Sequence, residues 1–190
     1  FYTIWDDLPY PYYNENFYRS CDWLGCISKQ TYNIVKQVRG RKENTEPWQI
    51  SYVPHGINEK KFHRVDKESE DFKEFRNKVL QGKDYEFVVF YNSRNIRRKM
   101  TSDIMLAFQQ FVQQLPEDKR DSTCLLMHTQ PIDDNGTDLL AVHRDVTPDI
   151  NLLFTNARFE QDGINKLYNV ADVTVNISSN EGFGLSVAES

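Results

Sequence analysis

Two carboxylates eight positions apart enclose a glycine turn near the end of the sequence: Glu181 and Glu189, with Gly182 and Gly184 between them. Glycine lets a backbone approach a ligand closely and adopt dihedral angles that other residues avoid. A helix beginning near Leu185 would offer unpaired N–H groups to a phosphate, while Glu189 accepts hydrogen bonds from a ribose diol. Glu181, before the turn, would reach a sugar. The alternative is that Glu189 only complements the helix dipole and Glu181 lies on a surface loop.

Four cations follow an apolar run in the middle of the sequence: Arg94, Arg97, Arg98 and Lys99, after residues 87–91. The apolar run predicts a buried strand, and in a doubly wound sheet the carboxyl end of a strand faces the ligand crevice. Guanidinium and ammonium groups neutralise diphosphate oxygens through charge-assisted hydrogen bonds. This loop therefore predicts a diphosphate site, against the alternative of an ordinary solvated basic loop.

The elements that would position these residues predict an α/β fold from residue 85 onward. Apolar strands and intervening helices are expected at 87–91, 101–114, 124–128, 150–154, 161–169 and 173–177. Strands that are apolar on both faces and alternate with helices indicate a Rossmann-like parallel sheet with helices on both faces. We expect the helix at 101–114 to be capped by Thr101 or Ser102, and the last strand to be buried.

The first 55 residues form a separate, aromatic-rich zone. Strands are expected at 23–28 and 49–53, around a helix at 29–39. The Pro/Gly break at 53–58 then indicates a loop or a crossing between domains. Within this break, and without other evidence, His55 is interpreted as a packed or solvent-facing imidazole and Gly56 as a turn residue. The charged stretch at 64–82 predicts an exposed helix.

The amino-acid composition argues against several classes of function. A net charge of −5 argues against a dedicated nucleic-acid binder, and no apolar run approaches the roughly 18 residues of a membrane span. Three cysteines without a scaffold spacing suit a reducing compartment, so a cytoplasmic location is expected. The four histidines do not pair with cysteines at ligand spacing, so we expect no zinc.

Taken in order, the motifs resemble the family 4 retaining glycosyltransferases of the GT-B fold. Residues 53–58 are similar to the family's Val-Pro-(His/Asn)-Gly-(Ile/Val)-(Asp/Asn) crossing, and residues 93–99 to its Gly-Arg-x-x-x-x-Lys loop, with Ser93 in place of glycine. Residues 181–189 match Glu-Gly-Phe-Gly-Leu-x-x-x-Glu throughout, and residues 167–173 resemble Leu-Tyr-x-x-Ala-Asp-Val.

The resemblance implies a nucleotide diphosphate sugar as donor (UDP-, GDP- or ADP-linked), transfer with retention of configuration, and no metal or cofactor. It makes Glu181 the catalytic residue that contacts the transferred sugar. The implied donor-binding residues are Arg94 and Lys99 for the diphosphate, Glu189 for the ribose, and Phe183, Gly184 and Leu185 for sugar and phosphate. The base would lie near residues 154–159. Supporting roles fall to His55, Gly56 and Arg98.

By the same resemblance, residues 1–55 are the end of an acceptor-side N-terminal Rossmann-like domain, and residues 56–85 are the interdomain crossing with its charged helix. Residues 86–190 are the nucleotide-sugar-binding domain, truncated at its C-terminus. We expect such a fragment to lack useful transferase activity by itself. The acceptor, and peripheral membrane contact through an N-terminal region outside the sequence, stay open. Two alternatives are a non-catalytic nucleotide-binding module and another GT-B enzyme such as an epimerase or phosphorylase.

Overall fold

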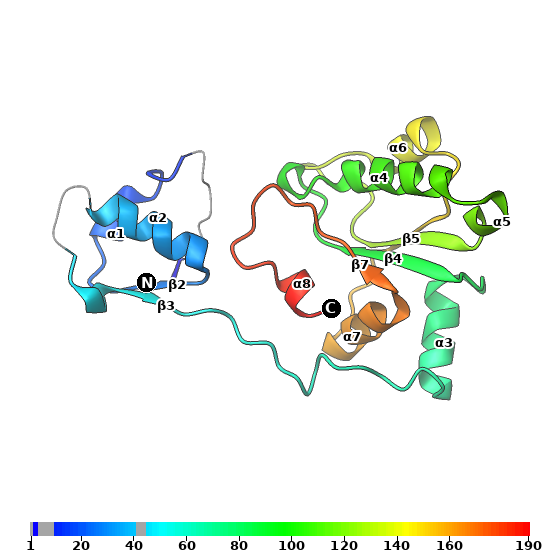
Figure 1. Ribbon diagram of the computed structural model, residues 1–190, viewed down its shortest axis with the longest axis horizontal. Coiled ribbons are helices and arrows are strands. Elements are labelled where there is room, and N and C mark those ends of the chain that lie inside the picture. Colours follow the sequence, from blue (N-terminus) through cyan, green and yellow to red (C-terminus); the bar gives the residue numbers. More distant parts are fainter. Residues whose placement is uncertain (1, 4–9, 41–44) are drawn as a thin grey trace. The chain divides into compact units, whose positions relative to one another are not determined.

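The computed structural model describes residues 2–3, 10–40 and 45–190 (Figure 1). Contacts within the chain divide it into two compact units, Phe1–Gly56 with Asn180–Leu185, and Ile57–Ser179 with Ser186–Ser190. Each unit contains one parallel sheet. Within the described part of the chain, no helix is long and apolar enough to cross a membrane.

The first unit is built on a three-stranded sheet in the order β1-β2-β3. Its elements are β1 (Tyr2–Thr3), α1 (Glu15–Arg19), β2 (Leu24–Cys26), α2 (Lys29–Gly40), the 3₁₀ turn η1 (Pro47–Gln49) and β3 (Ile50–Tyr52). One face of α2 buries Ile34, Val35 and Val38 in the same core cluster as the strand residues Leu24 and Ile50. That spacing is the apolar stripe of an amphipathic helix, which is why this segment folds onto the sheet.

The second unit is built on a four-stranded parallel sheet in the order β6-β5-β4-β7. Its strands are β4 (Phe87–Asn92), β5 (Thr123–His128), β6 (Leu152–Thr155) and β7 (Val173–Thr174). Its helices are α3 (Glu70–Val79), η2 (Arg97–Lys99), α4 (Thr101–Gln114), α5 (Glu117–Arg120), α6 (Leu139–Val146) and α7 (Gln161–Val170). A one-turn helix, α8 (Leu185–Ala188), lies near the end of the chain.

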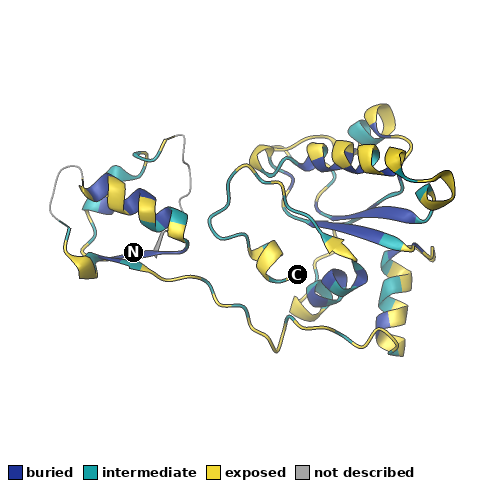
Figure 2. Ribbon diagram, in the orientation of Figure 1, coloured by how far each residue is buried: buried dark blue, intermediate teal, exposed yellow. Residues whose placement is uncertain are grey.

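Successive residues of β4 belong to two different cores. Val88 and Phe90 pack on the side of α3 and α7, whereas Val89 and Tyr91 pack on the side of α4 and α6. Figure 1 shows these helix pairs on opposite faces of the sheet, and Figure 2 shows the central strands buried between them. The alternation follows from the two-residue period of a strand, which makes a strand covered on both sides apolar throughout. The predicted parallel sheet with helices on both faces is confirmed.

The order of the strands creates a topological switch point. The chain runs outward from β4 to β5 and β6, and then returns to place β7 on the other side of β4. In open α/β sheets, ligands bind outside the carboxyl ends of the strands where the order reverses. The residues that directly follow β4 and β7 flank this point: the basic loop, and residues 175–179, which lead toward the terminal motif.

The last strand differs from its prediction as a buried strand over 173–177. β7 contains two residues, lies at the edge of the sheet, and leaves Val173 43% exposed. The N–H of Val175 still donates to the carbonyl of Phe90 at 2.9 Å, and beyond it the Oδ1 of Asn176 accepts a hydrogen bond from the N–H of Ser178 at 2.8 Å. Such an Asx turn offers the backbone a partner that competes with a neighbouring strand.

The start of α4 also differs from its prediction. The helix covers 101–114 as expected, but its N-cap is Met100, in the left-handed conformation with φ of 51°, and no side chain caps it. The Thr101 hydroxyl is instead 3.4 Å from the Tyr91 hydroxyl. Neither Thr101 nor Ser102 is therefore the cap. A non-glycine residue in this conformation stores strain of about 1–3 kcal/mol, and such residues gather near functional sites.

The segment that leads into α3 is held by two asparagines of α7. Asn165 Oδ1 accepts from the N–H of His63, and Asn169 Oδ1 from the N–H of Val65, both at 3.0 Å. The Nδ2 of Asn169 also donates to the carbonyl of His63 at 3.0 Å. These side chains supply hydrogen-bond partners to the backbone of an irregular segment that has none from secondary structure.

Candidate functional site

The loop after β4 and the segment after β7 are bonded to each other at the switch point. The N–H of Ser179 donates to the carbonyl of Arg98 at 2.9 Å, and its hydroxyl donates to the same oxygen at 3.2 Å. The N–H of Val175 also donates to the carbonyl of Phe90 at 2.9 Å. The basic loop and the approach to the terminal motif therefore adjoin, although their sequences are about eighty positions apart.

Arg94 forms a two-pronged ion pair with a carboxylate from the loop after β5. Its Nε and Nη2 donate to the two oxygens of Asp133 at 2.9 and 3.2 Å. Hydrogen bonding to Arg94 is the main cause that lowers the pKa of Asp133, and the same bond raises the pKa of Arg94. The Arg94 side chain remains 62% exposed, so its guanidinium is accessible to solvent and to an anion while Asp133 fixes its orientation.

Asn95 fastens the basic loop to the same neighbouring loop. Its side chain is 1% exposed, its Nδ2 donates to the carbonyl of Thr137 at 2.7 Å, and its Oδ1 accepts from the N–H of Thr137 at 3.2 Å. Gly136 permits this approach, because a Cβ at that position would lie 2.2 Å from the carbonyl oxygen of Asn95. The basic loop is therefore held by a buried amide and a required glycine.

Gly136→Ala is expected to lower the free energy of unfolding of the second unit by about 1–3 kcal/mol, because the clash with the Asn95 backbone must displace one of the two loops. Urea unfolding followed by circular dichroism measures this loss. Gly56→Ala is the control, since a Cβ there meets nothing within 4 Å. Equal stability of the Gly136 variant and the control would show that the two loops are not locked in this way.

Lys99 ends the basic loop directly before the strained cap of α4. The Tyr91 hydroxyl donates to the backbone carbonyl of Lys99 at 2.9 Å, and the Lys99 N–H donates to the carbonyl of Ile96 at 2.9 Å. Lys99 and Arg98 both belong to the 3₁₀ turn η2. The backbone that carries these cations is thus anchored to the core through Tyr91, which is 1% exposed.

Glu189 follows α8 and is tied to α7 and β4. Its Oε2 accepts from the Tyr168 hydroxyl at 3.1 Å, and the Tyr168 oxygen accepts from Asn92 Nδ2 at 2.9 Å. Burial raises the pKa of Glu189, and the Tyr168 hydrogen bond partly offsets that rise. Glu189 is the residue directly after α8. Its side chain is held by Tyr168 of α7.

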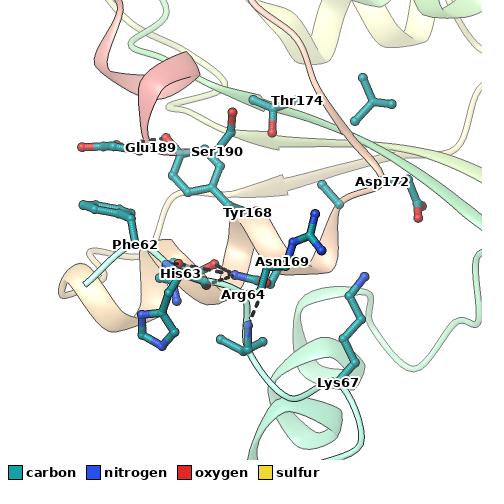
Figure 3. A pocket seen from close by; sticks show the side chains of 14 residues that line it. Phe62, His63, Arg64, Lys67, Tyr168, Asn169, Asp172, Thr174, Glu189 and Ser190 are labelled. Atoms are coloured by element: carbon teal, nitrogen blue, oxygen red, sulfur yellow. Dashed lines mark hydrogen bonds between the residues drawn. The ribbon is translucent and has the colours of Figure 1, made fainter. Parts of the chain in front are cut away.

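A pocket of about 760 Å³ adjoins Glu189 (Figure 3). Its walls come from α7, from the segment before α3 and from β7, and include Phe62, Arg64, Lys67, Asn169 and Asp172. Arg94 and Lys99 are not among its lining residues. The pocket thus shares Glu189 with the predicted donor site but does not contain the predicted diphosphate-binding residues.

The other predicted residues of the terminal motif belong to the first unit. Glu181, Phe183, Gly184 and Leu185 fall in Asn180–Leu185, and His55 and Gly56 fall in Phe1–Gly56, the other segment of the same unit. The rings of His55 and Phe183 meet edge to face, with centroids 5.3 Å apart and an interplanar angle of 89°. Gly184 adopts φ of +84°, a conformation that the turn needs and that favours glycine. The crossing motif and the glycine turn are therefore in contact.

The region that the resemblance assigns to the base contains ring packing. The ring of Phe159 lies 5.8 Å from that of Phe75 and 5.6 Å from that of His128. Burial lowers the pKa of His128, while its Nδ1 lies 2.9 Å from the carbonyl oxygen of Thr155.

The described residues contain no group of three or more His, Cys, Asp or Glu side chains that could hold a metal ion.

Sequence reasoning missed four residues that shape the site: Asp133, Asn95, Asn92 and Tyr168. A signal existed for the first, because Asp-Asp-Asn-Gly at 133–136 is typical of a turn built by an aspartate side chain, and the N–H of Asn135 does donate to Asp133 Oδ1 at 2.9 Å. The sequence does not indicate that Asp133 pairs with Arg94, because the two residues are 39 positions apart.

The described residues form a Rossmann-like α/β fold with parallel sheets, and this fold matches the GT-B fold. No protein-family model and no curated protein matches the sequence. Among solved structures, the chain is similar to the Candida albicans trehalose-6-phosphate phosphatase N-terminal domain, with a TM-score of 0.62 and 16% identity over 92% of this chain and 45% of that one. It is also similar to the trehalose-6-phosphate synthase OtsA, with a TM-score of 0.60 and 13% identity over 88% of this chain and 42% of that one. At these identities the likeness shows the fold, and the chain spans less than half the length of either structure.

Proposed function

We propose that this chain is part of a glycosyltransferase that binds a nucleotide diphosphate sugar and transfers the sugar with retention of configuration. The observation that carries the proposal is the bonding of the Arg94–Lys99 loop to the segment after β7, at the topological switch point. A ligand crevice is expected at that point of an open α/β sheet. Cations on one side of such a crevice favour a diphosphate.

In this proposal Arg94 and Lys99 bind the diphosphate and Glu189 binds the ribose. Glu181 and the backbone of Phe183–Leu185 contact the sugar and the adjoining phosphate. The positive groups stabilise the diphosphate as it leaves, so no metal is needed for that step. Fixed cations stabilise developing charge without having to reorganise during the reaction.

The Arg94–Asp133 pair is consistent with this role. Asp133 presents two oxygens to the guanidinium fork, which is also the geometry in which a phosphate binds arginine. A diphosphate would therefore compete with Asp133, or share the exposed guanidinium with it. In either case Arg94 is held in place before the donor arrives, which reduces the entropy lost on binding.

A thermal-shift panel of UDP-, GDP- and ADP-sugars tests the proposal. A ligand that binds only the folded state stabilises it by RT ln(1 + [L]/Kd), about 2.7 kcal/mol at a concentration of 100 Kd. One nucleotide series is expected to raise the unfolding temperature. Free sugars and inorganic phosphate at equal concentration serve as controls. Equal shifts for phosphate and for every nucleotide sugar would contradict a donor site.

One observation favours the non-catalytic module as a second candidate. Arg94 is already neutralised by a carboxylate of this chain, as in a binding site that does not assist a leaving group. Donor hydrolysis or sugar transfer by the protein, lost in Glu181→Gln while nucleotide binding persists, distinguishes an enzyme from such a module. Epimerisation or phosphorolysis of the donor in the same assay would identify another GT-B reaction.

A further inference from the structure

A hydrogen-bonded relay of three side chains joins α7 to the end of β4 and to the end of the chain. Asn92 Nδ2 donates to the Tyr168 oxygen at 2.9 Å, and the Tyr168 hydroxyl donates to Glu189 Oε2 at 3.1 Å. Figure 3 shows the Tyr168 ring directed from α7 toward Glu189. A phenolic hydroxyl can donate one hydrogen bond, here to the carboxylate, and its oxygen can still accept another, here from the Asn92 amide.

Aromatic packing fixes the position of the Tyr168 ring. It is 7% exposed and meets the rings of Phe90 and Phe62 edge to face, at centroid distances of 5.4 and 6.2 Å. Burial raises the pKa of Tyr168 far above its usual value, so the hydroxyl remains a neutral donor. The ring therefore has one packed orientation, and its proton is available to Glu189.

Tyr168 is the one side chain among the described residues that donates a hydrogen bond to Glu189. The bond engages Oε2 and leaves Oε1 for a ligand. Asn92 stands two positions before Arg94, at the start of the basic loop. A single phenol thus couples the orientation of the carboxylate to the loop that carries the cations.

We propose that Tyr168 is the positioning residue that holds Glu189 for recognition of the ribose, and that it links this recognition to the basic loop through Asn92. The inference rests on the proposed function of Glu189 and deepens it. Tyr168 does not touch the reacting atoms. It determines whether the site distinguishes a ribose from a sugar that lacks the hydroxyls.

Tyr168→Phe tests the inference, because it removes the hydroxyl and keeps the packed ring. Binding of UDP, GDP and ADP is measured by calorimetry beside their 2′-deoxy and 2′,3′-dideoxy forms. The wild-type chain is expected to favour the ribonucleotide by roughly tenfold or more, as for a hydrogen bond to a charged group. In Tyr168→Phe that preference is expected to fall by about fivefold or more, with little change in binding of the dideoxy form.

Tyr85→Phe is the matched control, since Tyr85 is a buried tyrosine of the same core cluster, 4% exposed, and not part of the relay. It is expected to keep the wild-type preference for ribose. Thermal unfolding of both variants checks that each is folded. Loss of the preference in both variants would assign the effect to the core and overturn the role of Tyr168.

A carboxyl-carbon NMR titration of Glu189 gives a readout that needs no nucleotide. Its pKa is expected to rise in Tyr168→Phe, because a donor to the ionised form is lost, and to stay unchanged in Tyr85→Phe. An unchanged ribose preference in Tyr168→Phe would overturn the inference and leave the proposed function standing. Failure of the wild-type chain to bind any of the nucleotides would overturn the proposed function, and the titration would still report whether Tyr168 holds Glu189.

Discussion

Replacing Arg94 and Lys99 together by alanine is expected to weaken nucleoside diphosphate binding by about a hundred- to ten-thousand-fold. Each charge-assisted hydrogen bond to a phosphate contributes about 1.5–3 kcal/mol, and each 1.4 kcal/mol changes the dissociation constant by about tenfold. Isothermal calorimetry with UDP and GDP measures the change. The fold should be retained, because the Arg94 side chain is 62% exposed and Asp133, whose side chain is 11% exposed, keeps the N–H of Asn135 as a hydrogen-bond donor.

The control for this double variant removes two positive charges elsewhere. Lys73 and Lys78 lie on α3, where Lys73 forms surface ion pairs with Glu68 and Glu70. Lys73→Ala/Lys78→Ala changes the net charge equally, so it shows how much of the loss is a general electrostatic effect. Unchanged affinity in the Arg94/Lys99 variant, or equal losses in both double variants, would contradict a diphosphate site in the basic loop.

Phe90→Ala is expected to lower the free energy of unfolding of the second unit by about 3–5 kcal/mol, the usual loss for a buried phenylalanine truncated to alanine. Phe90 is 0% exposed on the central strand β4 and supports the ring of Tyr168. The truncation therefore leaves a cavity between the sheet and α7. Urea unfolding followed by circular dichroism reports the loss.

The distribution of tryptophan makes the measurement specific to one unit. The three tryptophans are at positions 5, 23 and 48, so no tryptophan reports on the second unit, whereas circular dichroism does. Phe111→Ala is the matched control, since this phenylalanine of α4 is 37% exposed and should cost much less. A loss in Phe90→Ala no greater than in the control would refute the central place of Phe90 in the core.

Much of the second unit could be predicted because its elements are long and strongly patterned. The helix at 101–114 has the expected bounds, and all four apolar runs after residue 85 contain strands. The strand at 87–91 is apolar throughout, which only a strand covered on both faces requires. The parallel arrangement then follows from the alternation of strands and helices.

The errors came from features that depend on tertiary context. The composition of the last strand, rich in valine and isoleucine, indicated burial, but burial depends on neighbours that the pattern alone does not supply. The cap of α4 was misjudged because Thr101 has the right side chain for a cap, yet its hydroxyl lies beside Tyr91. In both cases a local preference was overridden by a contact from elsewhere in the fold.

The residues of the candidate site also divide into those that the sequence indicates and those that only the structure brings together. Arg94 and Lys99 could be proposed from charge and from their place after a strand, and Glu189 from its place after a glycine turn. Asp133 and Tyr168 could not be paired with them, because those contacts depend on how separate loops and a helix meet across the sheet. The roles of all these residues in donor binding stay predictions.

The two asparagines of α7 that hold the segment before α3 bear on the order in which the chain folds. They bond residues 102 and 104 positions away, and the entropy lost on closing a loop of that length corresponds to roughly 4 kcal/mol. Contacts so distant in sequence form slowly and gain stability only when their partner is already in place. Residues 63–65 should therefore become ordered late, after α7 has docked on the sheet.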